Sequence, residues 1–211
     1  QRDNAQRAME NKKNEIKQAA ELQGTLVIMN QFLIHYAPKQ IQGWSLSKAR
    51  CADQVCTLEY QNADWSAVEV LAKQTEGVCE LAVTTNGEAA VCTAGYEKAT
   101  LGESVSNKGG WLLDRSAISE IRKRLMEIAT YSDETSFNMN GPSNINIPGS
   151  QFLKGKPVIA ESGLTLSTGI TNLDQTAEFL SKGMPVALDE VVYDFEDNVI
   201  EIKARFFVEG E

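Results

Sequence analysis

Apolar residues recur at helical spacing near the start of the chain and alternate with polar residues further on. Residues 1–23 have only a thin apolar stripe, which predicts a solvated helix that frays, self-associates or pairs with a partner helix. We expect this helix not to dock on a core, so that its removal leaves stability nearly unchanged. Residues 25–37 have a fuller stripe and end before Pro38, so they predict a packed helix. The thin stripe consists of Ala5, Met9, Ile16 and Ala19.

Strand-like alternation begins at Trp44 and is interrupted by helical and glycine-rich segments. In the first half the pattern predicts strands over 44–51 and 56–61, a short helix over 65–73, and strands over 78–83 and 88–93. The polar segment 97–110 contains three glycines and predicts a linker. In the second half the pattern predicts a helix over 111–131, strands near 136–139 and 164–170, a helix over 172–183, and strands over 186–195 and 199–208.

The order of elements in the second half resembles that in the first. The short helices at Asp64 and Asn172 begin 108 residues apart, as do the strands at Val78 and Val186, which predicts a duplicated architecture. We therefore expect an α+β fold of two tandem ferredoxin-like (α-β-β-α-β-β) units, preceded by a polar helix able to form a coiled coil. The expected parts are a stalk (1–23), a first unit with two disulfides (24–96), a linker (97–110) and a second unit (111–211). The loop 140–163 is an insertion in the second unit.

All four cysteines lie in the first half of the chain, which points to disulfides or a metal site. Cys51 and Cys56 flank a short hairpin loop, and a turn at 84–87 would place Cys79 opposite Cys92. Sequence alone leaves three connectivities open for four cysteines, and four buried thiols in a cytosolic protein are a further alternative. We favour the pairs Cys51–Cys56 and Cys79–Cys92, because the spacings lack the paired knuckles of a zinc site.

Charge and composition narrow the function classes. The net charge is −9, from 29 acidic and 20 basic residues, so a nucleic acid would be repelled on average. No run of 18 or more apolar residues is present. The chain begins at Gln1 in a polar stretch, and we interpret this as the part of a protein that follows a membrane anchor.

A search for catalytic and ligand-binding patterns gives weak candidates. The single histidine, His35, lies in an apolar helical stretch and predicts a packed side chain rather than a catalytic base. Residues 149–157 look superficially like a phosphate-binding loop, but the glycine spacing is wrong. The acidic residues near 189–197 lack the pattern of a calcium loop. We therefore predict no enzyme activity, no metal site and no cofactor.

A sparse set of residues carries a family resemblance: Gly43-Trp44-Ser45-Leu46, Cys51, Tyr60, and Met184-Pro185-Val186 before the two last strands. In these residues and their order the chain resembles the periplasmic portion of the PilO-class inner-membrane proteins of type IV pilus assembly, particularly the type IVb kind. The resemblance covers about residues 38–208, and the second cysteine pair and the 140–163 loop do not match the family.

The resemblance implies a non-catalytic periplasmic scaffold, attached to the bacterial inner membrane by a segment outside this chain. Such a scaffold would link the inner-membrane platform to the outer-membrane secretin through homo-oligomers and contacts with sister assembly proteins. Two further readings remain open. One is the equivalent assembly protein of type II secretion, and the other is a periplasmic ligand-binding sensor domain, which an apolar pocket with convergent polar groups would favour.

The strand over 199–208 is the predicted interaction site. Ferredoxin-like units leave edge strands that can pair with other chains, and an outward Phe207 among charged residues suggests a contact point. A lone surface phenylalanine, or one covered by the other unit, is an equally open interpretation. The nominated residues are Val199, Glu201, Lys203, Arg205 and Phe207.

Overall fold

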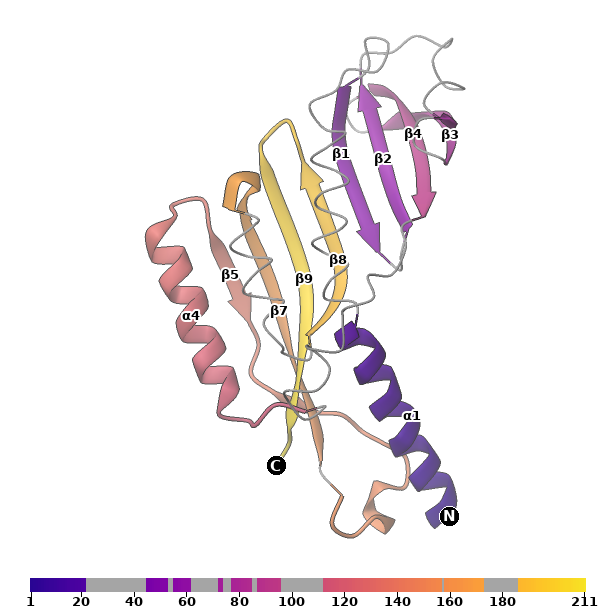
Figure 1. Cartoon of the computed structure of the whole chain (residues 1–211), viewed down its shortest axis with the longest axis vertical. Coiled ribbons are helices and arrows are strands. Elements are labelled where there is room, and N and C mark those ends of the chain that lie inside the picture. The colour runs from indigo at the N-terminus through magenta and orange to yellow at the C-terminus, as the bar shows by residue number, and fades with distance from the viewer. Residues whose placement is uncertain are drawn as a thin grey trace.

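The computed structural model describes residues 1–21, 45–52, 55–61, 72–73, 77–84, 87–95, 112–156, 158–172 and 186–211. In these ranges the backbone forms one antiparallel sheet of nine strands with two α-helices beside it (Figure 1). The helices are α1 (Arg2–Glu21) and α4 (Ala117–Tyr131), with short 3-10 turns η2 (Ser150–Phe152) and η3 (Ile170–Asn172). The strands are β1 (Ser45–Ala52), β2 (Val55–Gln61), β3 (Val78–Thr84), β4 (Gly87–Gly95), β5 (Ser136–Met139), β6 (Ser143–Asn144), β7 (Ile159–Gly169), β8 (Val186–Asp194) and β9 (Val199–Glu209).

The strands lie in the order β3-β4-β2-β1-β8-β9-β7-β5, with β6 paired to β7. β1 pairs with β8 over four residues, from Lys48 opposite Asp194 to Cys51 opposite Val191. Strands from both parts of the chain therefore belong to one sheet, and the predicted fold of two tandem ferredoxin-like units is wrong. Periodicity identified strands such as those beginning at Val78 and Val186, but it holds no information about pairing between strands distant in sequence.

The two ends of the sheet nevertheless share one strand order. The first four strands of the chain lie in the order third, fourth, second, first. The later strands repeat that order as β8-β9-β7-β5 when the two-residue strand β6, which lies off this path, is not counted. β8 thus occupies in its half the place that β3 occupies in the other. The predicted helix 25–37 and linker 97–110 lie outside the described residues, as do nearly all of the predicted helices 65–73 and 172–183.

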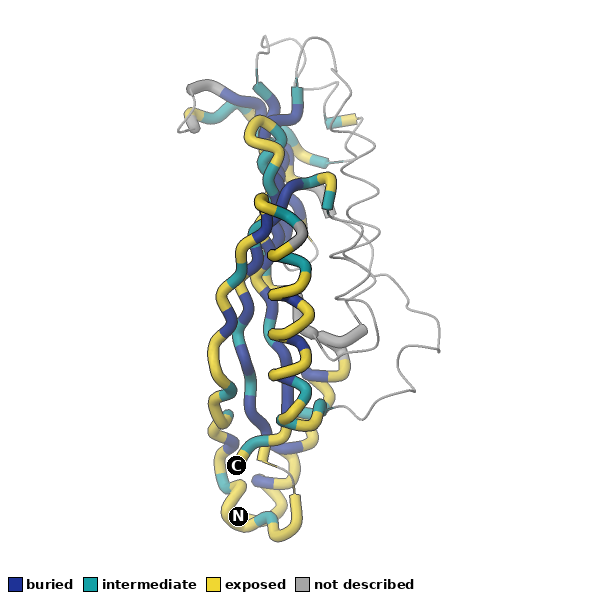
Figure 2. The backbone as a smooth tube through the Cα atoms, turned by 90° about the vertical axis from the view of Figure 1, so that its left-hand side faces the viewer, coloured by how far each residue is buried: buried dark blue, intermediate teal, exposed yellow. Residues whose placement is uncertain are grey.

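One face of the sheet, called here the inner face, forms the main core. Because side chains alternate along a strand, paired positions such as Ala49 with Tyr193 and Leu166 with Ile202 put apolar residues on this face in successive strands. Helix α4 packs its Ile118, Ile121 and Leu125 into the same cluster. These three residues recur at intervals of three and four, as expected for one face of a helix. Figure 2 shows the buried positions running along the strands.

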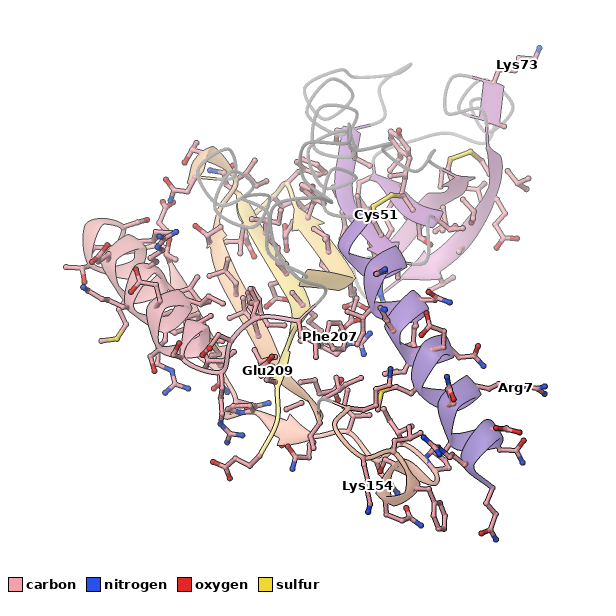
Figure 3. All side chains as sticks on the ribbon, turned by 60° about the horizontal axis from the view of Figure 1, so that its bottom comes forward. Arg7, Cys51, Lys73, Lys154, Phe207 and Glu209 are labelled. Carbon is pink, nitrogen blue, oxygen red and sulfur yellow. A yellow bond between two sulfur atoms is a disulfide. The ribbon has the colours of Figure 1, made fainter. Side chains whose placement is uncertain are left out.

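Helix α1 docks on the opposite, outer face, so the expectation that residues 1–23 do not pack on a core is wrong. Met9 and Ile16 form a second buried cluster with Ile147, Ile159 and Phe207. Phe207 is 2% exposed there and lies on the side of the sheet toward α1 (Figure 3). The stripe is thin, but it suffices because apolar residues of the loop 145–158, between β6 and β7, complete the apolar surface.

Gly149 lets this loop approach the helix closely. Its backbone is left-handed (φ 77°), and a Cβ added there would lie 2.9 Å from the Cβ of Ala5. Gly155 has a nearly equal φ of 74°, but an added Cβ would meet nothing within 4 Å. Of these two described glycines, Gly149 alone combines a left-handed backbone with a steric requirement on α1.

We expect Gly149→Ala to destabilise the protein more than its matched control Gly155→Ala. Both substitutions force alanine into a left-handed backbone, which costs about 1–2 kcal/mol, but only the first also crowds Ala5, which adds about 1–3 kcal/mol. Urea denaturation of the two variants measures the difference. An Ala5→Gly background should reduce it, whereas equal losses for both glycines would contradict the docking of α1 on this loop.

Candidate functional site

Charged side chains of β1, β7, β8 and β9 pair across the outer face. A bulge between Leu188 and Glu190 interrupts the β8–β9 register, and such an extra residue lets neighbouring side chains point to one face. Asp189 pairs with Arg205 at 2.9 Å, and Glu190 pairs with Lys203 at 3.7 Å. Glu190 also binds Arg50 across the β1–β8 junction.

Arg205 is the most enclosed cation of this surface. Its hydrogen bonds to Asp189 raise the pKa of its guanidinium above the usual value, and the nearby charge of Glu161 acts in the same direction, although burial opposes both. The guanidinium carbon also lies 5.5 Å from the centre of the Phe207 ring. Arg205 therefore has three internal partners, Asp189, Glu161 and Phe207, which makes it a structural cation rather than one available for a ligand.

The residues nominated from the sequence do not form an exposed edge. They belong to β9, which lies between β8 and β7, so the expectation of an edge strand is wrong. Phe207 is buried beneath α1 instead of projecting outward. Lys203 and Arg205 are in ion pairs, Glu201 is exposed and Val199 is half-buried. Alternation along β9 identified its two faces but could not show its place in the sheet.

The ends of the described sheet are β5 and β3. β5 has four residues and lies against α4. β3 has seven residues and pairs with β4 without any shift of register from Val78 to Thr84. Its side chains include two strongly exposed apolar residues, Val78 at 77% and Val83 at 84%. The β3 edge is therefore the longer and more apolar of the two, and sequence reasoning missed it because it depends on sheet order.

The register of the β3–β4 hairpin shows which backbone groups face this edge. The Cα atoms of Cys79 and Cys92 are 4.0 Å apart, a distance typical of pairs that do not exchange hydrogen bonds in an antiparallel ladder. Such pairs alternate with hydrogen-bonded pairs along the ladder. Leu81 and Val83, which lie two and four residues after Cys79, therefore also form pairs with β4 that exchange no hydrogen bonds. The N–H and C=O groups of Leu81 and Val83 therefore point away from β4.

Both favoured disulfides are present. Cys51 is bonded to Cys56 and Cys79 to Cys92, so all four cysteines of the chain are paired. Both bonds lie on the inner face, at the cross-strand positions that the hairpin loops predict. The second bond attaches the edge strand β3 to β4, next to the residues whose backbone faces the edge.

The weak sequence candidates have structural roles where they are described. Asp194 accepts hydrogen bonds from the backbone N–H groups of Glu196 and Asp197 at 3.1 and 3.0 Å, which shapes the β8–β9 turn. His35 lies outside the described residues. Among the described side chains, no group of three or more His, Cys, Asp and Glu could hold a metal ion. Neither of the two described α-helices is long and apolar enough to cross a lipid bilayer.

No family model, curated protein or solved structure matches this chain. The resemblance to the PilO class therefore stays a prediction, and the geometry of the sheet carries the functional argument.

We expect replacement of Cys79 and Cys92 by alanine to lower the free energy of unfolding by about 3 kcal/mol, and replacement of Cys51 and Cys56 by about 2 kcal/mol, because a longer closed loop loses more entropy when it is cross-linked. Urea denaturation of the two double variants gives both values. Amide hydrogen exchange in β3 should become faster only when the Cys79–Cys92 disulfide is removed. Equal acceleration in both variants would show that the Cys79–Cys92 bond does not hold the edge strand.

Proposed function

We propose that this chain is a non-catalytic scaffold domain of an oxidising, extracytoplasmic compartment, and that it binds another protein chain by receiving an extended strand of that chain along β3. The single observation that carries the proposal is the exposed seven-residue edge with Val83 at 84% exposure. A strand that docks at an edge gains main-chain hydrogen bonds, and side-chain contacts then select the partner.

The described β3 strand has few of the features that block an edge. Natural proteins protect edges with lysine, proline, bulges or very short strands. β3 contains neither lysine nor proline, and its pairing with β4 is uninterrupted. Its charged residue is Glu80, which lies on the outer face with Val78 and Ala82. An incoming strand would therefore meet a mainly apolar edge.

The second half of the sheet supplies an internal precedent. β8 holds the same place in its half of the strand order as β3 does in the other half. Along the edge that faces away from β9, β8 pairs antiparallel with β1. That junction joins only four residue pairs. A strand at this place in the order can therefore accept a further antiparallel strand. β3 has seven residues, which is more than the four that β8 pairs with β1.

The two disulfides support an oxidising compartment, because thiols in the cytosol are generally kept reduced. A periplasmic scaffold of pilus assembly is one member of the proposed class. Its specific partners, its anchoring to an inner membrane and the alternative place in type II secretion rest on the sequence resemblance.

The proposal predicts that the full chain binds a labelled peptide of residues 78–84 with serine in place of Cys79. The fluorescence anisotropy of the labelled peptide should rise to saturation as the chain is added, at concentrations low enough to limit pairing of the chain with itself. Val83→Pro should weaken the binding, because proline removes an N–H that points to the edge while the β4 ladder keeps its hydrogen bonds.

Met126→Lys is the matched control, since Met126 is an exposed apolar residue of α4 at 57% exposure. Its affinity for the peptide should equal that of the unaltered chain. Binding that is insensitive to Val83→Pro would place the peptide elsewhere, and no binding at all would contradict strand addition unless the chain already pairs with itself.

A further inference from the structure

We infer that the strand received by β3 is β3 of a second copy of this chain, paired antiparallel about a two-fold axis at Ala82. This inference rests on the proposed function and specifies its partner. It follows from the backbone groups that face the edge, from the placement of small and large side chains, and from the position of Glu80.

The backbone of β3 is compatible with this axis. With Ala82 opposite Ala82 of the second copy, Leu81 of each copy lies opposite Val83 of the other. The N–H and C=O groups of both residues point to the edge, because their pairs with Ala90 and Glu88 are of the class that does not exchange hydrogen bonds with β4. Each Leu81–Val83 pair can therefore exchange two backbone hydrogen bonds between the copies.

The side chains of β3 also suit this register. On the inner face, Val83 would pack over Leu81 of the second copy, which removes from water a valine that is 84% exposed in the single chain. On the outer face the two Ala82 residues would face each other at the axis. The two Ala82 residues would form a pair that exchanges no backbone hydrogen bonds, and such pairs have Cα atoms about 4.5 Å apart. Alanine is small enough for this close approach.

Glu80 distinguishes this register from its neighbours. About Ala82, each Glu80 lies opposite position 84, so the two carboxylates are separated by four residues, or about 13 Å along the strands. That distance exceeds the Debye length of about 8 Å at physiological salt. An axis at Leu81 would bring the two Glu80 side chains to a diagonal of about 7–8 Å, and an axis at Glu80 would set them directly opposite. Charge repulsion therefore favours the axis at Ala82 over those at Leu81 and Glu80.

A single cysteine tests the register in the full chain. Ala82→Cys should form a disulfide-linked dimer under mild oxidation, because paired Cα atoms at about 4.5 Å fit a disulfide; the native Cys79–Cys92 bond occupies the same class of pair. Glu80→Cys, on the same strand and face, should stay uncross-linked because its counterpart lies four residues away. Non-reducing electrophoresis and intact-mass measurement give the yields, and peptide mapping verifies the two native disulfides.

Sedimentation velocity of the unsubstituted chain, which has no introduced cysteine, tests the association itself. A concentration-dependent monomer–dimer equilibrium is expected, and Val83→Pro should raise its dissociation constant by about tenfold or more, since it removes a hydrogen bond at each of two symmetric positions. The control Met126→Lys should leave the dissociation constant unchanged.

The outcomes separate this inference from the proposed function. A chain that stays monomeric at every concentration, with no Ala82→Cys dimer, overturns self-pairing; strand addition then stands if the β3 peptide binds and falls if it does not. Equal cross-linking of Glu80→Cys and Ala82→Cys overturns the register. Growth beyond a dimer overturns the two-fold arrangement, because an isologous contact closes after two copies.

Discussion

The pairing of β1 with β8 is the contact on which the rest of the structure depends. It joins two sets of strands into one sheet through four residue pairs. On the inner face it sets Ala49 beside Tyr193, and both are fully buried. On the outer face Arg50 of β1 binds Glu190 of β8. A short ladder thus gains support from a continuous core on one side and an ion pair on the other, and it leaves β3 and β5 as the ends of the sheet.

Local features of the structure could be predicted from the sequence, whereas contacts between distant segments could not. The hairpin turns set the pairing of Cys51 with Cys56 and of Cys79 with Cys92 over separations of 5 and 13 residues, so turn chemistry alone was enough. The order of strands depends on contacts such as that between Cys51 and Val191, and no local pattern encodes them. The misplacement of β9 at an edge follows from this, because alternation reports faces and not neighbours.

Helix α1 shows a second limit of reasoning from periodicity. Its buried side chains, Ala5, Met9 and Ile16, follow the predicted stripe, but the stripe alone underestimates the apolar area that its partner surface supplies. That surface comes from Phe207 on the sheet and from Ile147 in the long loop, and the closest approach requires the absence of a side chain at Gly149. Whether a thin stripe docks therefore depends on the shape of a surface assembled from distant residues.

The edge strand and its disulfide belong to one physical arrangement. A strand at the end of a sheet has a neighbour on one side only, so it would open more readily than an internal strand. The Cys79–Cys92 bond restrains β3 near its start, at the end of the β3–β4 ladder away from the turn, and the backbone groups of Leu81 and Val83 point away from β4. An edge held in extended form loses less conformational entropy when another strand docks. In the proposed strand addition, the Cys79–Cys92 bond would therefore do more than stabilise the monomer, because it would keep β3 in the extended conformation that a docking strand needs.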